Sequence, residues 1–141
     1  EAESIIQAEN PSLIIFDQID KIQGFHADRN DLVMGSIYQW ARQLAKKYAP
    51  VIGICQSDGT GEGTKWLTMS HVAEAKTAKQ SEADWILGIG RLNSDEFQNV
   101  RHFNISKNKL MGDMDTESNW RHAKVDVLIE PEIARYRDLG E

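Results

Sequence analysis

A run of four apolar residues that ends in an acid places the strongest constraint on how this chain folds. The run is Leu13-Ile14-Ile15-Phe16, and Asp17 follows it directly. Continuous apolar runs of this length are typical of strands buried on both faces, as in a parallel sheet covered by helices. Ligands of open α/β folds bind at the carboxyl ends of such strands. The sequence therefore predicts an α/β fold with Asp17 at a binding edge.

The other predicted elements extend this fold along the chain. A helix that ends near Asn10 comes before the first strand, 12–17. The later elements, in order, are helix 32–48, strand 51–55, a glycine-rich segment at 57–68, helix 70–80, strands 85–90 and 101–107, and strands 124–129 and 133–137 joined by a turn at 130–132. This alternation predicts a mostly parallel sheet with an antiparallel extension at the C-terminal end. We expect Phe103 and Ile105 to face inward.

Composition limits the class of protein. With 141 residues the chain has the usual size of one domain. Its single cysteine, Cys55, excludes an internal disulfide and fits a reducing cytoplasm. No apolar run approaches the roughly 20 residues that span a bilayer, so we expect no membrane partner. The net charge of -6 argues against non-specific coating of nucleic acid, but a local basic loop or a ring could still bind it.

Two strand ends carry candidate nucleotide-binding residues. Asp17 could orient the waters of a magnesium ion beside a triphosphate, and capping of the following loop is the simpler interpretation of this strand alone. Gln56 follows the strand 51–55 and would project from the same sheet edge as Asp17. Its amide could sense a terminal phosphate or position a water, or it could hydrogen-bond a neighbouring loop.

Two lysines end a later strand. Lys107 and Lys109 are spaced by two residues, so on a strand both would point to the same side. Two cations placed in this way could neutralise negative charge that develops on a phosphate. A solvated strand end is the commoner explanation for such a pair.

The glycine-rich segment only superficially resembles a phosphate-binding loop. The phosphate-loop pattern requires Gly-Lys-Ser/Thr in succession, whereas Thr64 here separates Gly63 from Lys65 and Trp66 follows. We therefore reject that match. A mobile loop with Lys65 and Trp66 is better interpreted as a nucleic-acid contact, with lysine for phosphate and tryptophan for base stacking. A disordered crossover remains the alternative.

No metal-ligand cluster is visible in the sequence. The four histidines are scattered without metal-ligand spacing, and Cys55 has no cysteine partner. The remaining tryptophans are most simply core or rim residues: Trp40, Trp85 and Trp120.

Taken together, these segments resemble the carboxyl-terminal part of a RecA-like ATPase core, and more narrowly the hexameric replicative helicases of the DnaB type and phage primase–helicases. The matching segments, in the family's order, are 13–17 for the Walker B strand, 53–56 for the strand with the phosphate-sensing glutamine, 81–86 for the acidic stretch after the DNA-binding loop, and 105–113 for the late strand with its Gly-Asp loop. The resemblance implies a phage or bacterial helicase that uses ATP and magnesium, with Asp17 on the metal. It also implies a hexameric ring around single-stranded DNA, with Arg29, Lys65 and Trp66 as DNA contacts.

Two departures from the family pattern matter. The family's Walker A loop and catalytic glutamate lie upstream of Walker B, and this chain begins without an initiator methionine and too late to include them. We therefore expect an inactive fragment of a larger fold. Lys109 occupies the arginine-finger position, where it keeps the charge but loses the bidentate fork.

Two other classes compete with a helicase. A non-catalytic RecA-like module that only assembles or binds DNA is the main alternative. A signalling receiver domain also has a strand-end aspartate and lysine, but no earlier strand here supplies the pair of acids that its phosphoacceptor site needs.

Overall fold

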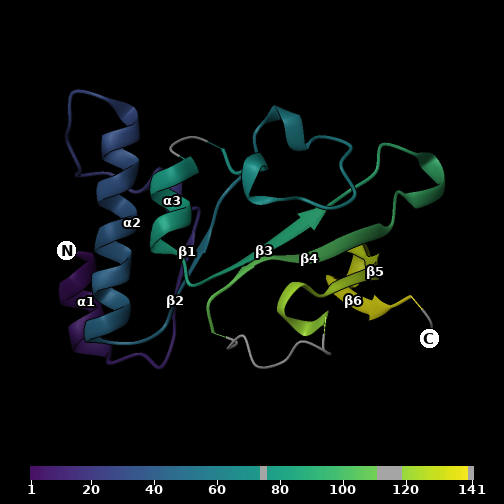
Figure 1. Cartoon of the computed structure of the whole chain (residues 1–141). Coiled ribbons are helices and arrows are strands. Elements are labelled where there is room, and N and C mark those ends of the chain that lie inside the picture. The colour runs from purple at the N-terminus through teal and green to yellow at the C-terminus, as the bar shows by residue number, and fades with distance from the viewer. Residues whose placement is uncertain (74–75, 111–118, 140–141) are drawn as a thin grey trace. The chain divides into compact units, whose positions relative to one another are not determined.

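A computed structural model of the chain describes residues 1–73, 76–110 and 119–139. The chain forms two compact units (Figure 1). The first unit contains Glu1–Gln56 and Ala73–Ala83, and the second contains Ser57–Val72 and Asp84–Glu141. Among the described residues, no helix is both long enough and apolar enough to cross a membrane.

The first unit is a two-stranded parallel sheet with three helices. Its elements, in order, are α1 (Ala2–Glu9), β1 (Ile14–Asp17), α2 (Asn30–Lys47), β2 (Val51–Ile54) and α3 (Lys76–Glu82). Asn10 ends α1 in the left-handed conformation, with φ of 45°, which asparagine adopts more readily than most residues. In the parallel pairing, Ile14 lies opposite Val51 and Asp17 lies opposite Ile54. The helix α2 makes the crossover that a parallel pair requires.

Helices cover only one face of this small sheet. Ile14 packs with the buried residues of α1 and α2, and Phe16 contacts the same cluster. The other face exposes Ile15 by 56%, Ile52 by 49% and Ile54 by 46%. The expectation that the first strand is buried on both faces is therefore wrong for the residues described.

The second unit contains a four-stranded antiparallel sheet. Its strands are β3 (Trp85–Gly90), β4 (Val100–Asn108), β5 (Lys124–Glu130) and β6 (Arg135–Asp138), paired in that order. A short 3₁₀ turn, Pro131–Ile133, joins β5 to β6, so the predicted C-terminal hairpin is confirmed. A register shift interrupts the pairing of β3 with β4 between Ile86 and Leu87.

The structure is α/β, but a mostly parallel sheet is not confirmed. Only β1 and β2 pair in parallel among the described strands, and the other four are antiparallel. The sequence order strand–helix–strand correctly indicates the β1–β2 pair. The connection from β3 to β4 spans only 91–99, a length that suits an antiparallel neighbour rather than a helical crossover.

The side chains that face the covered side of β4 are mostly polar. Val100, His102, Asn104 and Asn108 are buried, whereas Phe103 is only half-buried. Ile105, the other residue predicted to face inward, is also half-buried. The inward assignment of Phe103 and Ile105 is therefore wrong, because the alternate side chains of β4 lie on the more buried face.

The glycine-rich segment covers this polar face. It contains the 3₁₀ turns Gly59–Gly61 and Met69–His71, and Ser57 forms an isolated bridge with Val72. Asn104 Nδ2 donates a hydrogen bond to the carbonyl of Leu67 at 2.6 Å. The predicted helix 70–80 is thus divided between a 3₁₀ turn and α3, and residues 74–75 lie outside the described part.

Glycines in β3 permit this close approach of backbone to backbone. A Cβ atom on Gly88 would lie 2.8 Å from the Leu67 carbonyl oxygen. A Cβ atom on Gly90 would collide with the carbonyl oxygens of Thr64 and Lys65. The segment therefore rests directly on the strand, where no side chain would fit.

Candidate functional site

Asp17 and Gln56 lie at one edge of the parallel sheet. Asp17 is the last residue of β1 and lies opposite Ile54, and Gln56 follows two residues later. Both side chains are exposed. Because parallel strands end at the same edge, the two residues are at the carboxyl end, where open α/β folds bind ligands. The Phe16 ring packs 5.4 Å from the ring of Trp40 in α2, which fixes the end of β1.

A buried ion pair lies just beyond the end of β1. Lys79 in α3 is only 2% exposed, and its Nζ lies 2.8 Å from Asp20 Oδ2. The Tyr38 hydroxyl donates to the other carboxylate oxygen of Asp20 at 2.9 Å. Burial, with the nearby Cys55 and Asp20, raises the pKa of Tyr38, so its hydroxyl stays protonated as a donor. The sequence analysis missed this cluster, because a lysine in a short polar helix gives no sign of being buried.

The donor set fits a loosely held magnesium ion better than a protein-caged metal. Among the described residues, no three His, Cys, Asp or Glu side chains gather as a metal site. Magnesium commonly keeps several waters and binds through one or two carboxylates plus substrate phosphates. Asp17, as an exposed carboxylate at a strand end, fits that kind of site.

The two strand-end lysines occupy different local environments. Lys107 lies within β4 opposite Ile86, next to the register shift. Lys109 lies beyond the end of β4, and its backbone N–H donates to the Asp84 carbonyl at 2.8 Å. Strand alternation therefore does not extend to Lys109, and the argument that both side chains point to one side loses its basis. Both lysines belong to the second unit, and the Gly112-Asp113 part of the late motif lies outside the described residues.

Lys65 and Trp66 are packed against the second unit's sheet rather than left in a loose loop. The Nζ of Lys65 lies 3.0 Å from Asp126 Oδ2 and 4.8 Å from the centroid of the Trp66 ring. The Trp66 ring also contacts His102 edge-on, with centroids 5.5 Å apart. A second ammonium, that of Lys124, lies 5.4 Å from the same tryptophan ring.

Asp126 links the segment to β4. Its Oδ1 lies 2.7 Å from His102 Nδ1, so the carboxylate contacts both His102 and Lys65. Burial by itself raises the pKa of Asp126, but the hydrogen bonds with His102 and Lys65 outweigh it, and the net pKa is lowered. Asp126 is therefore a carboxylate at neutral pH. Within the described part of the chain, His102 Nε2 and Asn104 Oδ1 have no hydrogen-bond partner.

Arg29, the third predicted DNA contact, immediately precedes α2. Its Nε and Nη2 atoms bind the two carboxylate oxygens of Asp31 at 3.0 and 2.8 Å. The Arg29 side chain is still 72% exposed, so the guanidinium remains accessible to solvent.

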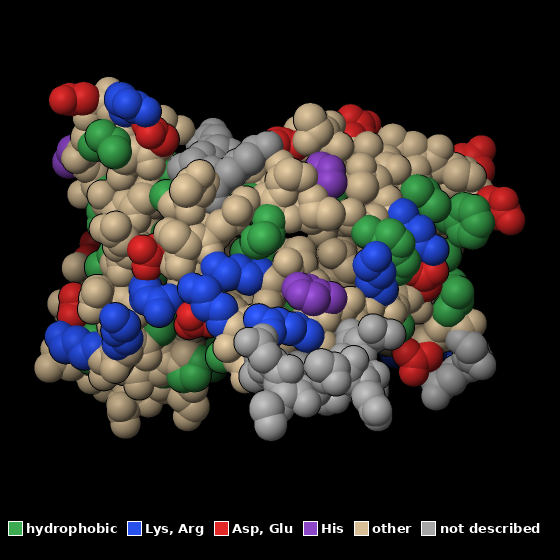
Figure 2. Space-filling model, viewed as in Figure 1, with side chains coloured by type: hydrophobic (Ala, Val, Ile, Leu, Met, Phe, Trp, Pro, Cys, Tyr) green, Lys and Arg blue, Asp and Glu red, His purple; other side chains and the backbone are tan. Residues whose placement is uncertain are grey.

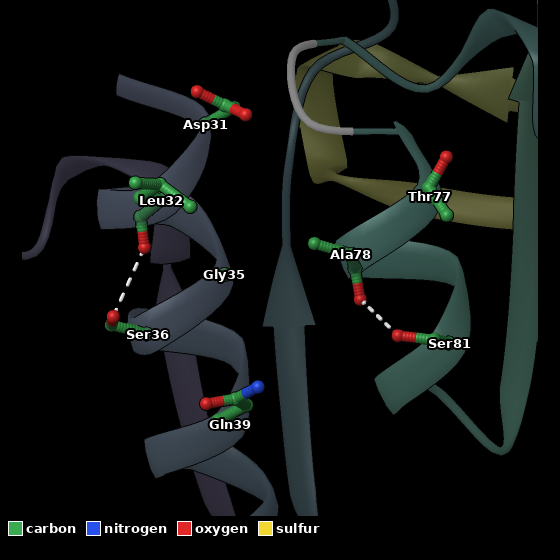
Figure 3. Close-up of a pocket in the computed structure, with 8 residues that line it drawn as sticks. All are labelled: Asp31, Leu32, Gly35, Ser36, Gln39, Thr77, Ala78 and Ser81. Carbon is green, nitrogen blue, oxygen red and sulfur yellow. Dashed lines mark hydrogen bonds between the residues drawn. The ribbon is translucent and has the colours of Figure 1, made fainter. Parts of the chain in front are cut away.

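A shallow pocket of about 500 Å³ lies between α2 and α3 (Figure 3). Its serine hydroxyls bond to their own helices, since Ser36 donates to the Leu32 carbonyl and Ser81 donates to the Ala78 carbonyl. The lining residues are Asp31, Leu32, Gly35, Ser36, Gln39, Thr77, Ala78 and Ser81. The pocket includes neither Asp17 nor Gln56, so it is distinct from the predicted nucleotide edge.

Comparison with solved structures defines the class of fold. No family model matches the sequence, and no curated protein matches it. The fold is that of replicative helicase ATPase domains. The chain is similar to a helicase ATPase domain solved by itself, with a TM-score of 0.75 and 16% identity, over 98% of this chain and 49% of that one. It is also similar to a DnaB-like replicative helicase, solved in a study of its interactions with primase, with a TM-score of 0.76 and 16% identity, over 98% of this chain and 34% of that one.

These comparisons confirm the fold that the sequence motifs indicated. The chain spans about half of the first matched protein and about a third of the second.

Proposed function

We propose that this chain is part of an ATP-dependent replicative DNA helicase that translocates on single-stranded DNA and unwinds duplex DNA. The observation that carries the proposal is the similarity of 98% of the chain to replicative helicase ATPase domains. The open aliphatic face formed by Ile15, Ile52 and Ile54 supports a place in a longer protein, because such faces are usually covered.

The nucleotide chemistry is assigned to the edge that carries Asp17 and Gln56. Asp17 holds magnesium through water, and the ion neutralises charge on the ATP phosphates. Gln56 detects the terminal phosphate. The cradle for the phosphates comes from another segment of the longer protein, so the isolated chain neither binds ATP tightly nor hydrolyses it.

The protein acts as a homohexameric ring. Lys107 and Lys109 reach the nucleotide of an adjacent subunit and stabilise charge on the transferred phosphoryl group. Arg29, Lys65 and Trp66 contact the DNA strand, with lysine and arginine on phosphates and tryptophan on a base.

The test uses the full-length protein in an ATPase assay with and without single-stranded DNA, together with unwinding of a forked duplex. We expect Asp17→Ala to abolish both activities and the exposed Asp95→Ala, as a matched control, to retain them. Full activity of Asp17→Ala would refute the proposal. DNA binding by a wild-type protein that has no ATPase activity would favour the alternative, a non-catalytic RecA-like assembly or DNA-binding module.

A further inference from the structure

The Trp66 ring lies between two lysines whose surroundings differ. Lys65 forms an ion pair with Asp126 at 3.0 Å. Lys124, the first residue of β5, is exposed and has no ion-pair partner in the described part of the chain. Its only recorded contact there is with the Trp66 ring, at 5.4 Å from the centroid. One ring thus adjoins one neutralised cation and one cation without a carboxylate.

The carboxylate of Asp126 decides how each lysine interacts with a polyanion. A DNA phosphate that approaches Lys65 also approaches Asp126, which is ionised and is held in place by His102. Like charges repel, so the pair with Asp126 weakens the attraction of Lys65 for phosphate. Lys124 has no such opposing charge in salt-bridge contact.

We propose that Lys124 is a further residue of the single-stranded DNA site, where it contacts a backbone phosphate beside a base stacked on Trp66. The inference rests on the proposed function, since it assigns a new contact to the same DNA-binding segment. Lys65 then acts chiefly by holding Trp66 in place through Asp126, and it contributes less to the electrostatic attraction than Lys124.

The chemistry of the three side chains suits this division of roles. A tryptophan ring stacks on any base, so it binds single strands without sequence preference. The flexible four-carbon stem of Lys124 lets its ammonium move from the ring to a phosphate when a base takes its place. Although the chain carries a net charge of -6, Lys and Arg side chains are exposed on the visible face of each unit (Figure 2). Local positive charge is therefore available for DNA.

The experiment measures the affinity of the full-length protein for a labelled oligothymidine by fluorescence anisotropy, between about 50 and 200 mM salt. Each phosphate contact that is lost should flatten the plot of log affinity against log salt by about 0.7. We expect Lys124→Ala to show this change and Lys65→Ala to show a smaller one. Asp126→Asn, which removes the opposing charge from Lys65, should steepen the slope. The exposed Lys46→Ala in α2 is the matched control and should leave the slope unchanged.

The outcomes separate this inference from the function on which it rests. If Trp66→Ala weakens binding about tenfold or more while Lys124→Ala leaves the slope unchanged, the role of Lys124 is refuted and the DNA-binding segment stands. A flattening by Lys65→Ala equal to or larger than that by Lys124→Ala would also refute the proposed division. If the Trp66, Lys65 and Lys124 variants all bind like wild type, the assignment of this segment to DNA fails, and the inference fails with it.

Discussion

The two units bury different kinds of side chain beneath their sheets. In the first unit, α2 contributes Met34, Ile37, Ala41 and Leu44 to an aliphatic core. In the second, β4 buries polar residues under the glycine-rich segment, among them His102 and Asn104. Aliphatic packing is non-directional, whereas a buried polar group costs free energy unless it is hydrogen-bonded. The second unit therefore depends on a few specific contacts, and the first on volume and shape.

The largest expected effect comes from the polar exception within the aliphatic unit. Lys79 is almost fully buried and pairs with Asp20 at 2.8 Å. Lys79→Met should lower the free energy of unfolding by about 3–5 kcal/mol, because it leaves a buried carboxylate without its cation. Urea unfolding of the full-length protein measures this, with the exposed Lys46→Met as control, for which a change of about 0.5 kcal/mol or less is expected. Equal stabilities of the two variants would show that the first unit does not depend on this polar contact.

The aliphatic core itself is tested by truncating Ile37. This residue is 0% exposed in α2, so Ile37→Ala removes packed methylene groups and leaves a cavity. We expect a loss of about 3 kcal/mol. Leu32→Ala in the same helix is the matched control, because Leu32 is 52% exposed and its loss should be well under half as large. Similar losses for the two variants would mean that this face of α2 is not the core.

The same contrast explains what the sequence could predict. Apolar runs identified the strands, and the β3 range 85–90 agrees with the structure because the run is bounded by polar residues on both sides. Parallel pairing follows from a helical crossover, so the shared edge of Asp17 and Gln56 could be predicted from local order alone. Both results come from signals that lie within a few residues of the element.

The errors arise where distant segments decide burial. Phe103 and Ile105 are the apolar members of an alternating strand, and alternation alone assigns them to the core. The segment that contains Leu67 instead covers the opposite face, through a hydrogen bond with Asn104. The pairing of Lys65 with Asp126 is equally non-local. No periodicity in a single strand records such contacts, and so the packed state of the glycine-rich segment was missed.

A third prediction tests whether the glycine-rich segment must rest directly on β3. Gly90→Ala places a methyl group against the backbone carbonyls of Thr64 and Lys65, which cannot move without shifting the segment. We expect a loss of about 2 kcal/mol and faster amide hydrogen exchange in 57–72. Gly59→Ala is the control, because a Cβ atom there meets nothing within 4 Å. If both variants exchange alike, the segment does not pack closely on β3.

The smallest expected effect is a response to acid at Asp126. Its pKa is lowered in the folded state, because the hydrogen bonds with His102 and Lys65 outweigh the effect of burial. A carboxyl group with a lowered pKa stabilises the fold above its unfolded pKa of about 4, and this contribution is lost as the pH falls through the folded value. The Lys65 side chain is 40% exposed, so solvent screening should limit the contribution to about 1 kcal/mol or less.

The environment of Trp66 reports this loss, because Lys65 and His102 both contact its ring. The difference in fluorescence between wild type and Trp66→Phe should change as the pH falls below about 4. Asp126→Asn cannot ionise and should show no such transition at Trp66, while its isosteric amide preserves the shape of the site. A transition of equal size in Asp126→Asn would assign the acid response to other carboxylates. The polar contacts under β4 would then not be what distinguishes the second unit from the first.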